Sequence, residues 1–194
     1  MNTRRDFIKS GLAGLLGAGV LPLGCSTPPV QGLNYLFITM DTTRRDHLGC
    51  YGYSKPTSPV IDQFAKEALL FEEAYSTSHI TIPAHLSLFT GLHPYNTGVL
   101  FNGARSLLDA RIPTIGSYFQ EKGYDTRAIT SARFLNTHLF GCSFNTVLHP
   151  TSLLSHSAEH TVNAFENMLK VKNYASGDKP FLTWLHFWDP HSPY

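Results

Sequence analysis

Two stretches of the chain consist almost entirely of apolar and β-branched residues. The first, residues 34–40, ends at Asp41, and the second, residues 181–187, ends just before Asp189 and His191. Unbroken apolar runs of this length are typical of strands that are buried on both faces of a parallel sheet. We therefore expect a buried central strand at residues 34–40 and a second strand at residues 181–187.

Apolar residues with helical spacing occupy the segments between these strands, and a further strand is expected at residues 126–131. The predicted helices are residues 58–70, 83–89, 113–122 and 158–171. Strands that alternate with helices predict an α/β domain with a mainly parallel sheet flanked by helices. Sites in such sheets form where the strands end, so Asp41, Asp189 and His191 are candidate functional residues.

The composition narrows the class of protein. The chain has 194 residues, of which 42% are hydrophobic and 15% are charged, and its formal net charge is +1. These values are typical of a globular protein with a sizeable core. A net charge near zero, without a basic stripe, argues against nucleic acid as a partner.

Residues 1–30 are expected to be an export signal and tether that precede the folded domain, residues 31–194. The pair Arg4-Arg5 precedes an aromatic residue, a lysine and a glycine-rich apolar run, which resembles a twin-arginine (Tat) export signal. An ordinary Sec signal or an uncleaved anchor is the alternative. The apolar run is too short for a spanning helix of the folded protein.

Three cysteines bear on localisation and redox state. The segment around Cys25 resembles a bacterial lipobox, in which Cys25 would be lipidated and would attach the protein to a membrane. The alternative is a signal that is cleaved nearby, with Cys25 incidental. In either case we expect an exported protein of the periplasm or cell envelope. Cys50 and Cys142 could form a disulfide or remain as two buried thiols, and their spacing argues against zinc.

A Thr-x-Pro sequence opens one of the predicted helices. Pro83 suits the first helical position, because its missing N–H and fixed φ cost little there. Thr81 would then lie just outside the helix N-terminus, where free N–H groups and the helix dipole favour an anion. Two interpretations are open: Thr81 is a helix cap, or it is a nucleophile that faces a charged ester.

Several short motifs occur together along the chain. They are Asp41 after the first strand, DHLGCYGY at residues 46–53, TIPAH at 81–85, LFTG at 88–91, GYDT at 123–126 and DPHSP at 189–193. As a set, over residues 33–194, they resemble the N-terminal part of the sulfatase family, within the alkaline phosphatase-like superfamily. The resemblance implies an alkaline phosphatase-like fold and a metal-dependent ester hydrolase.

The resemblance implies a divalent cation that is held partly by Asp41. Calcium is the first expectation, with magnesium, manganese or zinc as alternatives. A hard cation takes carboxylate oxygens and can stabilise charge on a transferring sulfuryl or phosphoryl group. Many family members have a second acid where this chain has Thr42. A helix cap or a turn residue is the alternative role for Asp41.

The resemblance also places Thr81 at the position of the nucleophile. Sulfatases have a cysteine or serine there that becomes formylglycine, within Cys/Ser-x-Pro-x-Arg, whereas this chain has Thr-x-Pro-x-His. Threonine cannot give the formylglycine aldehyde, but its alkoxide could attack directly if a metal lowered the pKa of the hydroxyl. Threonine nucleophiles occur among phosphodiesterases and phosphoethanolamine transferases of the superfamily.

Three further residues receive catalytic roles from the resemblance. His85 replaces the arginine of the motif and could donate to the nucleophile or to substrate oxygens. Arg133 keeps a cation near the place of the Lys-x-His motif of sulfatases. His191 could protonate the leaving oxygen. Structural roles are the alternative for both histidines, and His186, inside a predicted strand, is interpreted as structural.

The leading hypothesis is an exported, metal-dependent hydrolase of sulfate or phosphate esters, with a small-molecule or glycan ester as substrate. The alternatives are a phosphodiesterase or phosphotransferase with Thr81 as nucleophile, and a non-catalytic member that binds an anionic glycan or lipid headgroup. Family members continue beyond the position of Tyr194 and supply further metal ligands there. The resemblance therefore implies that the C-terminal part is missing and that this chain alone is inactive.

Overall fold

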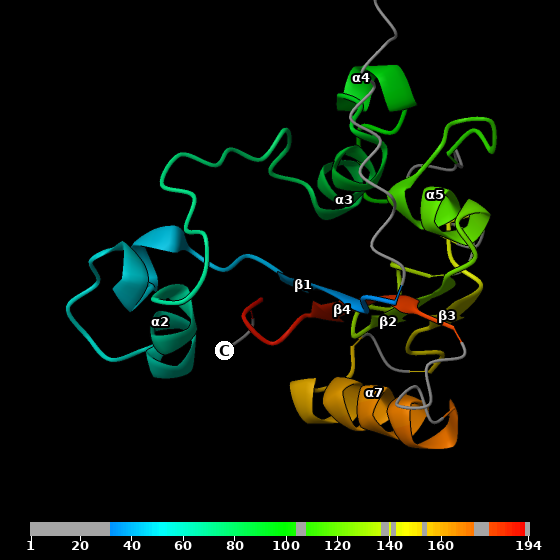
Figure 1. The fold of residues 1–194 in the computed structure, drawn as a ribbon. Coiled ribbons are helices and arrows are strands. Elements are labelled where there is room, and N and C mark those ends of the chain that lie inside the picture. The colour runs from blue at the N-terminus through cyan, green and yellow to red at the C-terminus, as the bar shows by residue number, and fades with distance from the viewer. Residues whose placement is uncertain are drawn as a thin grey trace, which may run out of the picture. The chain divides into compact units, whose positions relative to one another are not determined.

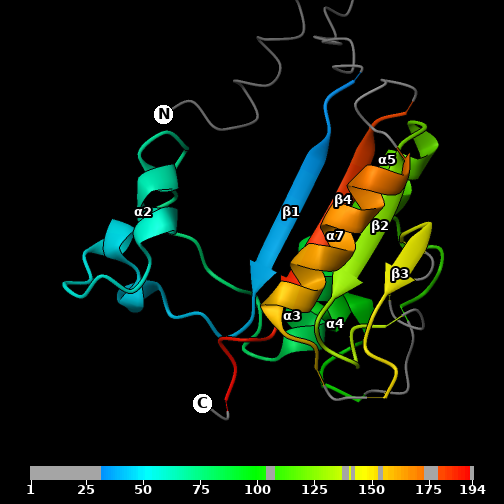
Figure 2. The ribbon, with the colours of Figure 1, turned by 90° about the horizontal axis from the view of Figure 1, so that it is seen from below.

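A four-stranded parallel sheet is the framework of the molecule. Its strands are β1 (Tyr35–Met40), β2 (Asp125–Thr130), β3 (Thr146–Leu148) and β4 (Phe181–Phe187), in the spatial order β1-β4-β2-β3. All pairings are parallel, and Figure 2 shows the strands running in one direction. Their carboxyl ends therefore meet at one edge, and the predicted parallel α/β fold is confirmed.

The computed structural model describes residues 32–103, 108–136, 140, 143–152, 155–172 and 179–192. The predicted export signal, the lipidation of Cys25 and the position of Cys142 lie outside these residues. Cys50 carries a free, partly buried thiol within the described part of the chain. No helix among the described residues is long and apolar enough to cross a membrane.

Helices cover both faces of the sheet (Figure 1). The helices α3 (Thr81–Thr90), α4 (Pro94–Thr97) and α5 (Ile115–Glu121) lie on one face, and α7 (Ala158–Lys172) lies on the other. Side chains alternate between the faces along a strand. Trp184 of β4 therefore packs on Phe89 of α3, whereas Thr183 contacts Met168 of α7.

An aromatic cluster fixes α3 on the sheet. The ring of Trp184 is fully buried, and the rings of Phe89, Phe140 and Phe144 lie with their centroids 4.7, 5.0 and 6.0 Å from it. Each buried large side chain contributes about 1.5–3 kcal/mol through the apolar area that it removes from water. The aromatic cluster thus holds α3 against the sheet.

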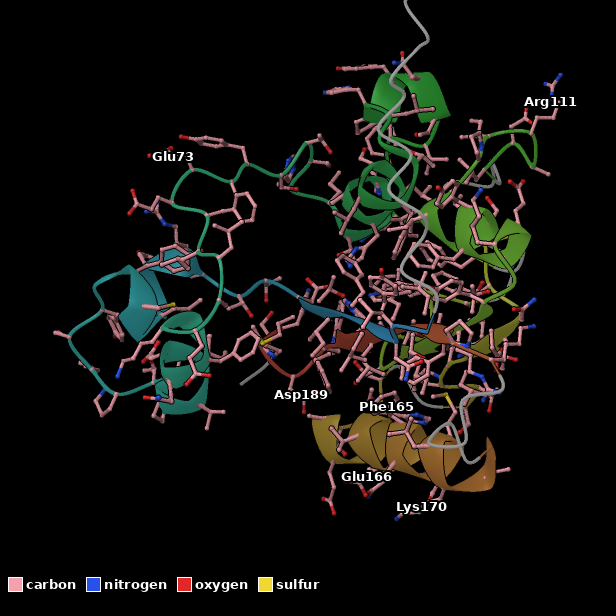
Figure 3. The ribbon with its side chains drawn as sticks, viewed as in Figure 1. Glu73, Arg111, Phe165, Glu166, Lys170 and Asp189 are labelled. Carbon is pink, nitrogen blue, oxygen red and sulfur yellow. The ribbon has the colours of Figure 1, made fainter. Side chains whose placement is uncertain are left out.

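The opposite face is covered by the apolar side of α7. Phe165 packs on Phe181 of β4, with ring centroids 6.2 Å apart. Glu166 and Lys170 lie one turn apart and point away from the sheet (Figure 3), and their charged groups are 3.8 Å from each other. This arrangement follows from the helical spacing of apolar residues, and the predicted helix at residues 158–171 is confirmed.

The position of β1 differs from the prediction. Among the described strands β1 pairs only with β4, so it is an edge strand, and Leu36, Ile38 and Met40 are 46%, 50% and 38% exposed. The expectation of a buried central strand was wrong. A continuous apolar run shows that both faces of a strand are apolar, but it does not show that the described chain covers both of them.

The helix predicted at residues 58–70 is also shorter than expected. The observed helix α2 (Pro59–Ala65) has seven residues, and its apolar side chains Val60 and Phe64 are 81% and 72% exposed. Short helices depend on packing of their apolar face, and this face packs on little within the described chain. Two short 3-10 helices, η1 (Arg45–His47) and η2 (Gly49–Tyr51), precede α2, and Asp62 of α2 accepts a bond from the N–H of Cys50.

Candidate functional site

A cleft of about 950 Å³ opens where β1 ends and α3 begins. Its walls come from residues 39–43 at the end of β1, from residues 74–80, and from α3 with the turn that follows it. Three of the residues singled out in the sequence line this cleft: Asp41, Thr81 and His85. The structure thus brings Asp41 together with two residues that lie 40 and 44 positions further along the chain.

Asp41 lies at the end of β1 with its carboxylate buried. Its N–H donates to the carbonyl of Phe187 at 2.9 Å, and its residue is 8% exposed. The Oδ2 atom has no hydrogen-bond partner in the described part of the chain and lies 3.6 Å from Nε2 of His186. Burying a carboxylate oxygen without a partner is unfavourable. The oxygen therefore suits a bound cation.

Unsatisfied polar atoms gather around this cleft. Among the described residues, four buried side-chain polar atoms lack a hydrogen-bond partner: Asp41 Oδ2, Thr43 Oγ1, Ser87 Oγ and His186 Nε2. Asp41, Thr43 and Ser87 line the cleft, and His186 touches Asp41. Since buried polar groups in proteins are nearly always paired, such a cluster marks a place where a polar ligand completes the bonding.

A divalent cation fits the carboxylate of Asp41, because hard cations take carboxylate oxygens. No group of three or more His, Cys, Asp or Glu residues that could hold a metal occurs among the described residues. A cation bound to Asp41 would therefore need ligands besides the side chains of these four types in the described part of the chain.

Thr81 is the first residue of α3, two positions earlier than the sequence predicted. Ile80 is the N-cap, with an extended backbone and no capping side chain. The interpretation of Thr81 as the cap was therefore wrong, because the residue itself has helical geometry. Its hydroxyl makes no hydrogen bond within the described part of the chain, and the residue lines the cleft. The hydroxyl is therefore available to a ligand in the cleft.

The backbone donors at this end of α3 are nearly all occupied. The N–H of Ile82 donates to Oδ1 of Asn102 at 2.9 Å, Pro83 has no N–H, and the N–H of Ala84 donates to Ile80 at 3.0 Å. Among these residues the N–H of Thr81 is left without a partner. The helix end therefore offers an anion one backbone donor and the positive end of the helix dipole.

His85 is buried one turn below Thr81. Its Nδ1 donates to the carbonyl oxygen of Thr81 at 2.8 Å, and its Nε2 lies 3.4 Å from Oγ1 of Thr39. Burial lowers the pKa of His85, against the smaller opposing effects of the bond to Thr81 and the charge of Asp41. The ring is therefore neutral at pH 7 and contacts the backbone of Thr81, not its hydroxyl.

His186 lies next to Asp41, although the sequence analysis interpreted it as structural. Its side chain is fully buried, and its Nδ1 lies 2.8 Å from Oγ1 of Thr39, its neighbour in the sheet register. Burial and, to a smaller extent, the neighbouring His85 lower the pKa of His186 to about 3. A histidine one position from the end of a mainly apolar strand was the signal available in the sequence.

Asp189 has a structural role. Its Oδ1 accepts a hydrogen bond from the N–H of Ala158, the first residue of α7, at 2.9 Å. Figure 3 shows Asp189 between the end of β4 and the start of α7. A carboxylate at this place satisfies a backbone donor and complements the helix dipole. Its position after a strand, which made it a candidate, is explained by this cap.

His191 and Arg133 do not line the cleft. The ring of His191 stacks on Trp188, with centroids 3.8 Å apart, and its Nδ1 donates to the carbonyl of Ser192 at 2.7 Å. The Nε2 atom is thus the nitrogen available for proton transfer. Arg133 is exposed in the turn after β2.

The loops that follow β1 and β4 are tied together beside Asp41. The hydroxyl of Thr42 donates to the carbonyl of Pro190 at 3.0 Å. Thr42 has a φ of 51°, and it is the one non-glycine residue in the described part of the chain with a positive φ. The left-handed region is unfavourable for a β-branched residue, and such strain concentrates at functional sites. This hydrogen bond places the loop that carries His191 next to Asp41, the candidate metal ligand.

Comparison with known proteins identifies the fold class first. A protein of the alkaline phosphatase superfamily from Vibrio parahaemolyticus has the same fold, with a TM-score of 0.62, 20% identity, and coverage of 83% of this chain and 41% of that one. The crystal structure of a 2-O GAG sulfatase matches with a TM-score of 0.62 and 26% identity, covering 81% of this chain and 35% of the other. The fold is therefore alkaline phosphatase-like.

The family follows from the sequence itself. The sulfatase family profile matches residues 33–194, and the chain belongs to the sulfatase family. Human iduronate 2-sulfatase is 34% identical over 131 residues, which are 66% of this chain and 23% of the human protein. The chain thus spans about a quarter of the length of that relative. Members of the family hydrolyse sulfate esters and typically depend on a metal ion.

Proposed function

We propose that the protein carrying this chain is a metal-dependent hydrolase of anionic esters in which the hydroxyl of Thr81 is the nucleophile, with phosphate esters preferred to sulfate esters. One observation carries the proposal. Thr81 stands in the first turn of α3 with its hydroxyl unbonded among the described residues, and it lines the same cleft as the unpartnered carboxylate of Asp41.

The chain's own residues have distinct tasks in this reaction. The N–H of Thr81 and the dipole of α3 bind an anionic oxygen of the ester. His85, through its bond to the carbonyl of Thr81, fixes the turn that carries the nucleophile. His191 does not line the cleft, but its loop is bonded through Pro190 to Thr42 of the cleft wall, and Nε2 of His191 would give a proton to the leaving oxygen. A divalent cation, with Asp41 among its ligands, would supply the positive charge that lowers the pKa of a hydroxyl and stabilises the transferred group.

The reaction proceeds in two displacements. In the first, Oγ1 of Thr81 gives its proton to solvent and forms a bond to phosphorus while the bond from phosphorus to the ester oxygen breaks, and the alcohol leaves with a proton from Nε2 of His191. In the second, water attacks phosphorus and returns one proton to His191, while the bond to Oγ1 breaks and Oγ1 takes a proton from solvent, which restores the hydroxyl and releases phosphate. No redox step or further reactant is needed.

The preference for phosphate follows from the nature of the nucleophile. A formylglycine hydrate can release sulfate by elimination from its geminal diol, whereas a threonine adduct can be removed only by attack of water. A phosphothreonine is easier to hydrolyse at a metal site than a sulfothreonine would be by the same attack. The substrate is proposed to be a small-molecule or glycan ester, because the named relatives are sugar sulfatases.

Localisation is proposed from the sequence alone. The pair Arg4-Arg5 and the apolar run after it support export to the periplasm or cell envelope, and Cys25 supports a lipid anchor there. The structure does not describe these residues.

The test of the proposed function compares Thr81→Ala with Thr81→Ser. Because the chain spans part of its relatives, the assay uses protein expressed from the longest reading frame that contains it, with aryl phosphate monoesters, diesters and sulfates as substrates. We expect Thr81→Ala to abolish turnover while the fold survives, and Thr81→Ser to retain some of it. An alanine variant with most of the activity would exclude Thr81 as nucleophile. Faster cleavage of sulfate than of phosphate by the unchanged protein would exclude the substrate preference.

A further inference from the structure

Beneath the cleft lies a buried polar network, which we call the Thr39 network and which consists of Thr39, His85, Trp184 and His186. Three nitrogens surround the hydroxyl oxygen of Thr39. They are Nε1 of Trp184 at 2.9 Å, Nδ1 of His186 at 2.8 Å and Nε2 of His85 at 3.4 Å. A hydroxyl can accept two hydrogen bonds and donate one. The assignment of its single proton decides the protonation of both histidines.

The direction of the hydrogen bond is unambiguous in two contacts, that of Trp184 with Thr39 and that of His85 with Thr81. The indole N–H of Trp184 can only donate, so it donates to Oγ1 of Thr39. The carbonyl oxygen of Thr81 can only accept, so Nδ1 of His85 carries a proton. The ring of His85 is buried and already carries its proton on Nδ1, so in the neutral ring Nε2 is a bare acceptor. The hydroxyl of Thr39 therefore gives its proton to His85.

These assignments fix the direction of the hydrogen bond between Thr39 and His186. With its proton used, Oγ1 of Thr39 can only accept from His186, so Nδ1 of His186 carries the ring proton and Nε2 is bare. This is the assignment that satisfies all three contacts of Thr39. The reverse tautomer would take the proton from His85 and leave its buried Nε2 without a donor, which is unfavourable.

Nε2 of His186 consequently faces Oδ2 of Asp41 with no proton between them. The two atoms are 3.6 Å apart, which is beyond a normal N–H···O bond, and both are buried without a partner in the described part of the chain. Two electron-rich atoms held face to face repel each other unless a cation lies between them. Their spacing suits this, because ligand atoms each about 2.0–2.2 Å from one Zn²⁺ are roughly 3–4 Å apart.

We propose that Nε2 of His186 and Oδ2 of Asp41 bind the same divalent cation, so that His186 is a metal ligand of this site. The inference rests on the proposed function for the presence of the cation, and it adds a ligand and a class of ion. A pair of one imidazole nitrogen and one carboxylate oxygen selects Zn²⁺ or a similar first-row ion, whereas Ca²⁺ and Mg²⁺ take oxygen ligands. The Thr39 network holds His186 in the tautomer that binds.

The experiment measures metal binding and not turnover. The chain is titrated with Zn²⁺ in competition with a chromophoric chelator, and with Co²⁺ followed by its absorption spectrum. His186→Asn keeps an amide N–H that can donate to Thr39 but deletes Nε2, and Asp41→Asn removes the carboxylate. We expect either change to weaken Zn²⁺ binding at least about tenfold and to alter the Co²⁺ spectrum. The matched control is His149→Asn, since Nδ1 of His149 also donates to a carbonyl, that of Pro150, outside the cleft.

A variant that touches no metal tests the network itself. His85→Asn can still donate to the carbonyl of Thr81, but it offers Thr39 no acceptor in place of Nε2. Thr39 is then free to donate to Nδ1 of His186, which moves the proton of that ring to Nε2 and blocks the ligand. We expect about tenfold weaker Zn²⁺ binding. In the unchanged, metal-free chain, ¹⁵N NMR should show the Nδ1–H tautomer of His186, a readout that needs no variant to fold.

The outcomes separate this inference from the proposed function. Weaker binding in Asp41→Asn with unchanged binding in His186→Asn would leave the cation in place and exclude His186 as its ligand. An Nε2–H tautomer, or tighter binding of Ca²⁺ than of Zn²⁺ and Co²⁺, would also overturn the inference. If the unchanged chain binds none of these ions, the inference fails together with the cation of the proposed function. Circular dichroism verifies that each variant is folded.

Discussion

Helices α3 and α7 lie on opposite faces of one sheet, and their first turns are completed in different ways. At α7 the carboxylate of Asp189 accepts from the first N–H of the helix. At α3 the neutral amide of Asn102 accepts from the second N–H, and the N–H of Thr81 is left without a partner among the described residues. One helix end is closed by a negative charge, and the other is open to the cleft.

The difference separates a helix end that is capped by a charge from one that can bind an anion. A carboxylate at a helix N-terminus satisfies donors and offsets the dipole, so little is left to attract a ligand anion. A neutral cap leaves the helix dipole available to attract an anion. Both helix ends are close to strand ends that carry an aspartate, but Asp189 serves a helix, whereas Asp41 remains unpartnered beneath the cleft. Position at a strand end is therefore not enough to assign function.

The largest expected effect concerns pH, because the two buried histidines of the described residues, His85 and His186, both lie under α3. Burial and the neighbouring His85 lower the pKa of His186 to about 3, from an ordinary value of 6.5. Between these values the unfolded chain binds a proton that the folded chain does not. The free energy of unfolding should therefore fall as the pH falls below 6.5, by about 1.4 kcal/mol per pH unit for this group.

The measurement is chemical denaturation of the chain with a chelator present, at pH 7 and at pH 5. We expect His186→Asn to show a clearly smaller loss of stability on acidification than the unchanged chain, because the titrating imidazole is absent. Asp41 and His85 also face this ring and can add to the remaining slope. Equal slopes in both proteins would show that His186 is not a buried neutral group.

The second prediction concerns two substitutions that exchange the charged and neutral groups at the N-termini of α3 and α7. Asn102→Asp places a carboxylate at the end of α3, and Asp189→Asn removes one at α7. We expect Asn102→Asp to weaken the binding of sulfate or vanadate about tenfold, which corresponds to about 1.4 kcal/mol, whereas Asp189→Asn leaves it unchanged. Isothermal titration calorimetry compares the two. Equal effects at both ends would remove the distinction between them.

The smallest effect concerns stability. Asp189→Ala removes a helix cap and should lower the free energy of unfolding by about 1 kcal/mol. Thr81→Ala removes a hydroxyl that caps nothing and should change the free energy of unfolding by less than about 0.5 kcal/mol. Denaturant titrations of the two variants provide the comparison. A loss near 1 kcal/mol in Thr81→Ala would restore the interpretation of Thr81 as a structural residue.

The sequence predicted the positions of individual helices and strands better than it predicted which of their surfaces are covered. The strand at residues 181–187 and the start of the helix at Ala158 agree with the structure, because apolar periodicity and turn residues act over short distances. The edge position of β1 and the short α2 were missed. Both depend on which surfaces the rest of the chain covers, and a local pattern carries no information about that.

The same limit applies to the site. The family resemblance implied that Asp41, Thr81 and His85 share a site, and these three residues line one cleft in the structure. The roles of Asp189 and His186 could not be predicted, because each depends on a partner far along the chain. Asp189 meets Ala158 across 31 positions, and His186 meets Thr39 across 147. Only the sheet register and the packing of α7 create these contacts.

The most direct test of the central claim is to trap the covalent adduct. Protein from the longest reading frame that contains this chain is mixed with an aryl phosphate ester, quenched in acid within milliseconds, digested and examined by mass spectrometry. The account predicts a phosphoryl group on Thr81, formed and lost at rates compatible with turnover, and absent in Thr81→Ala. Turnover with the adduct on another residue, or turnover that persists in Thr81→Ala, would contradict it.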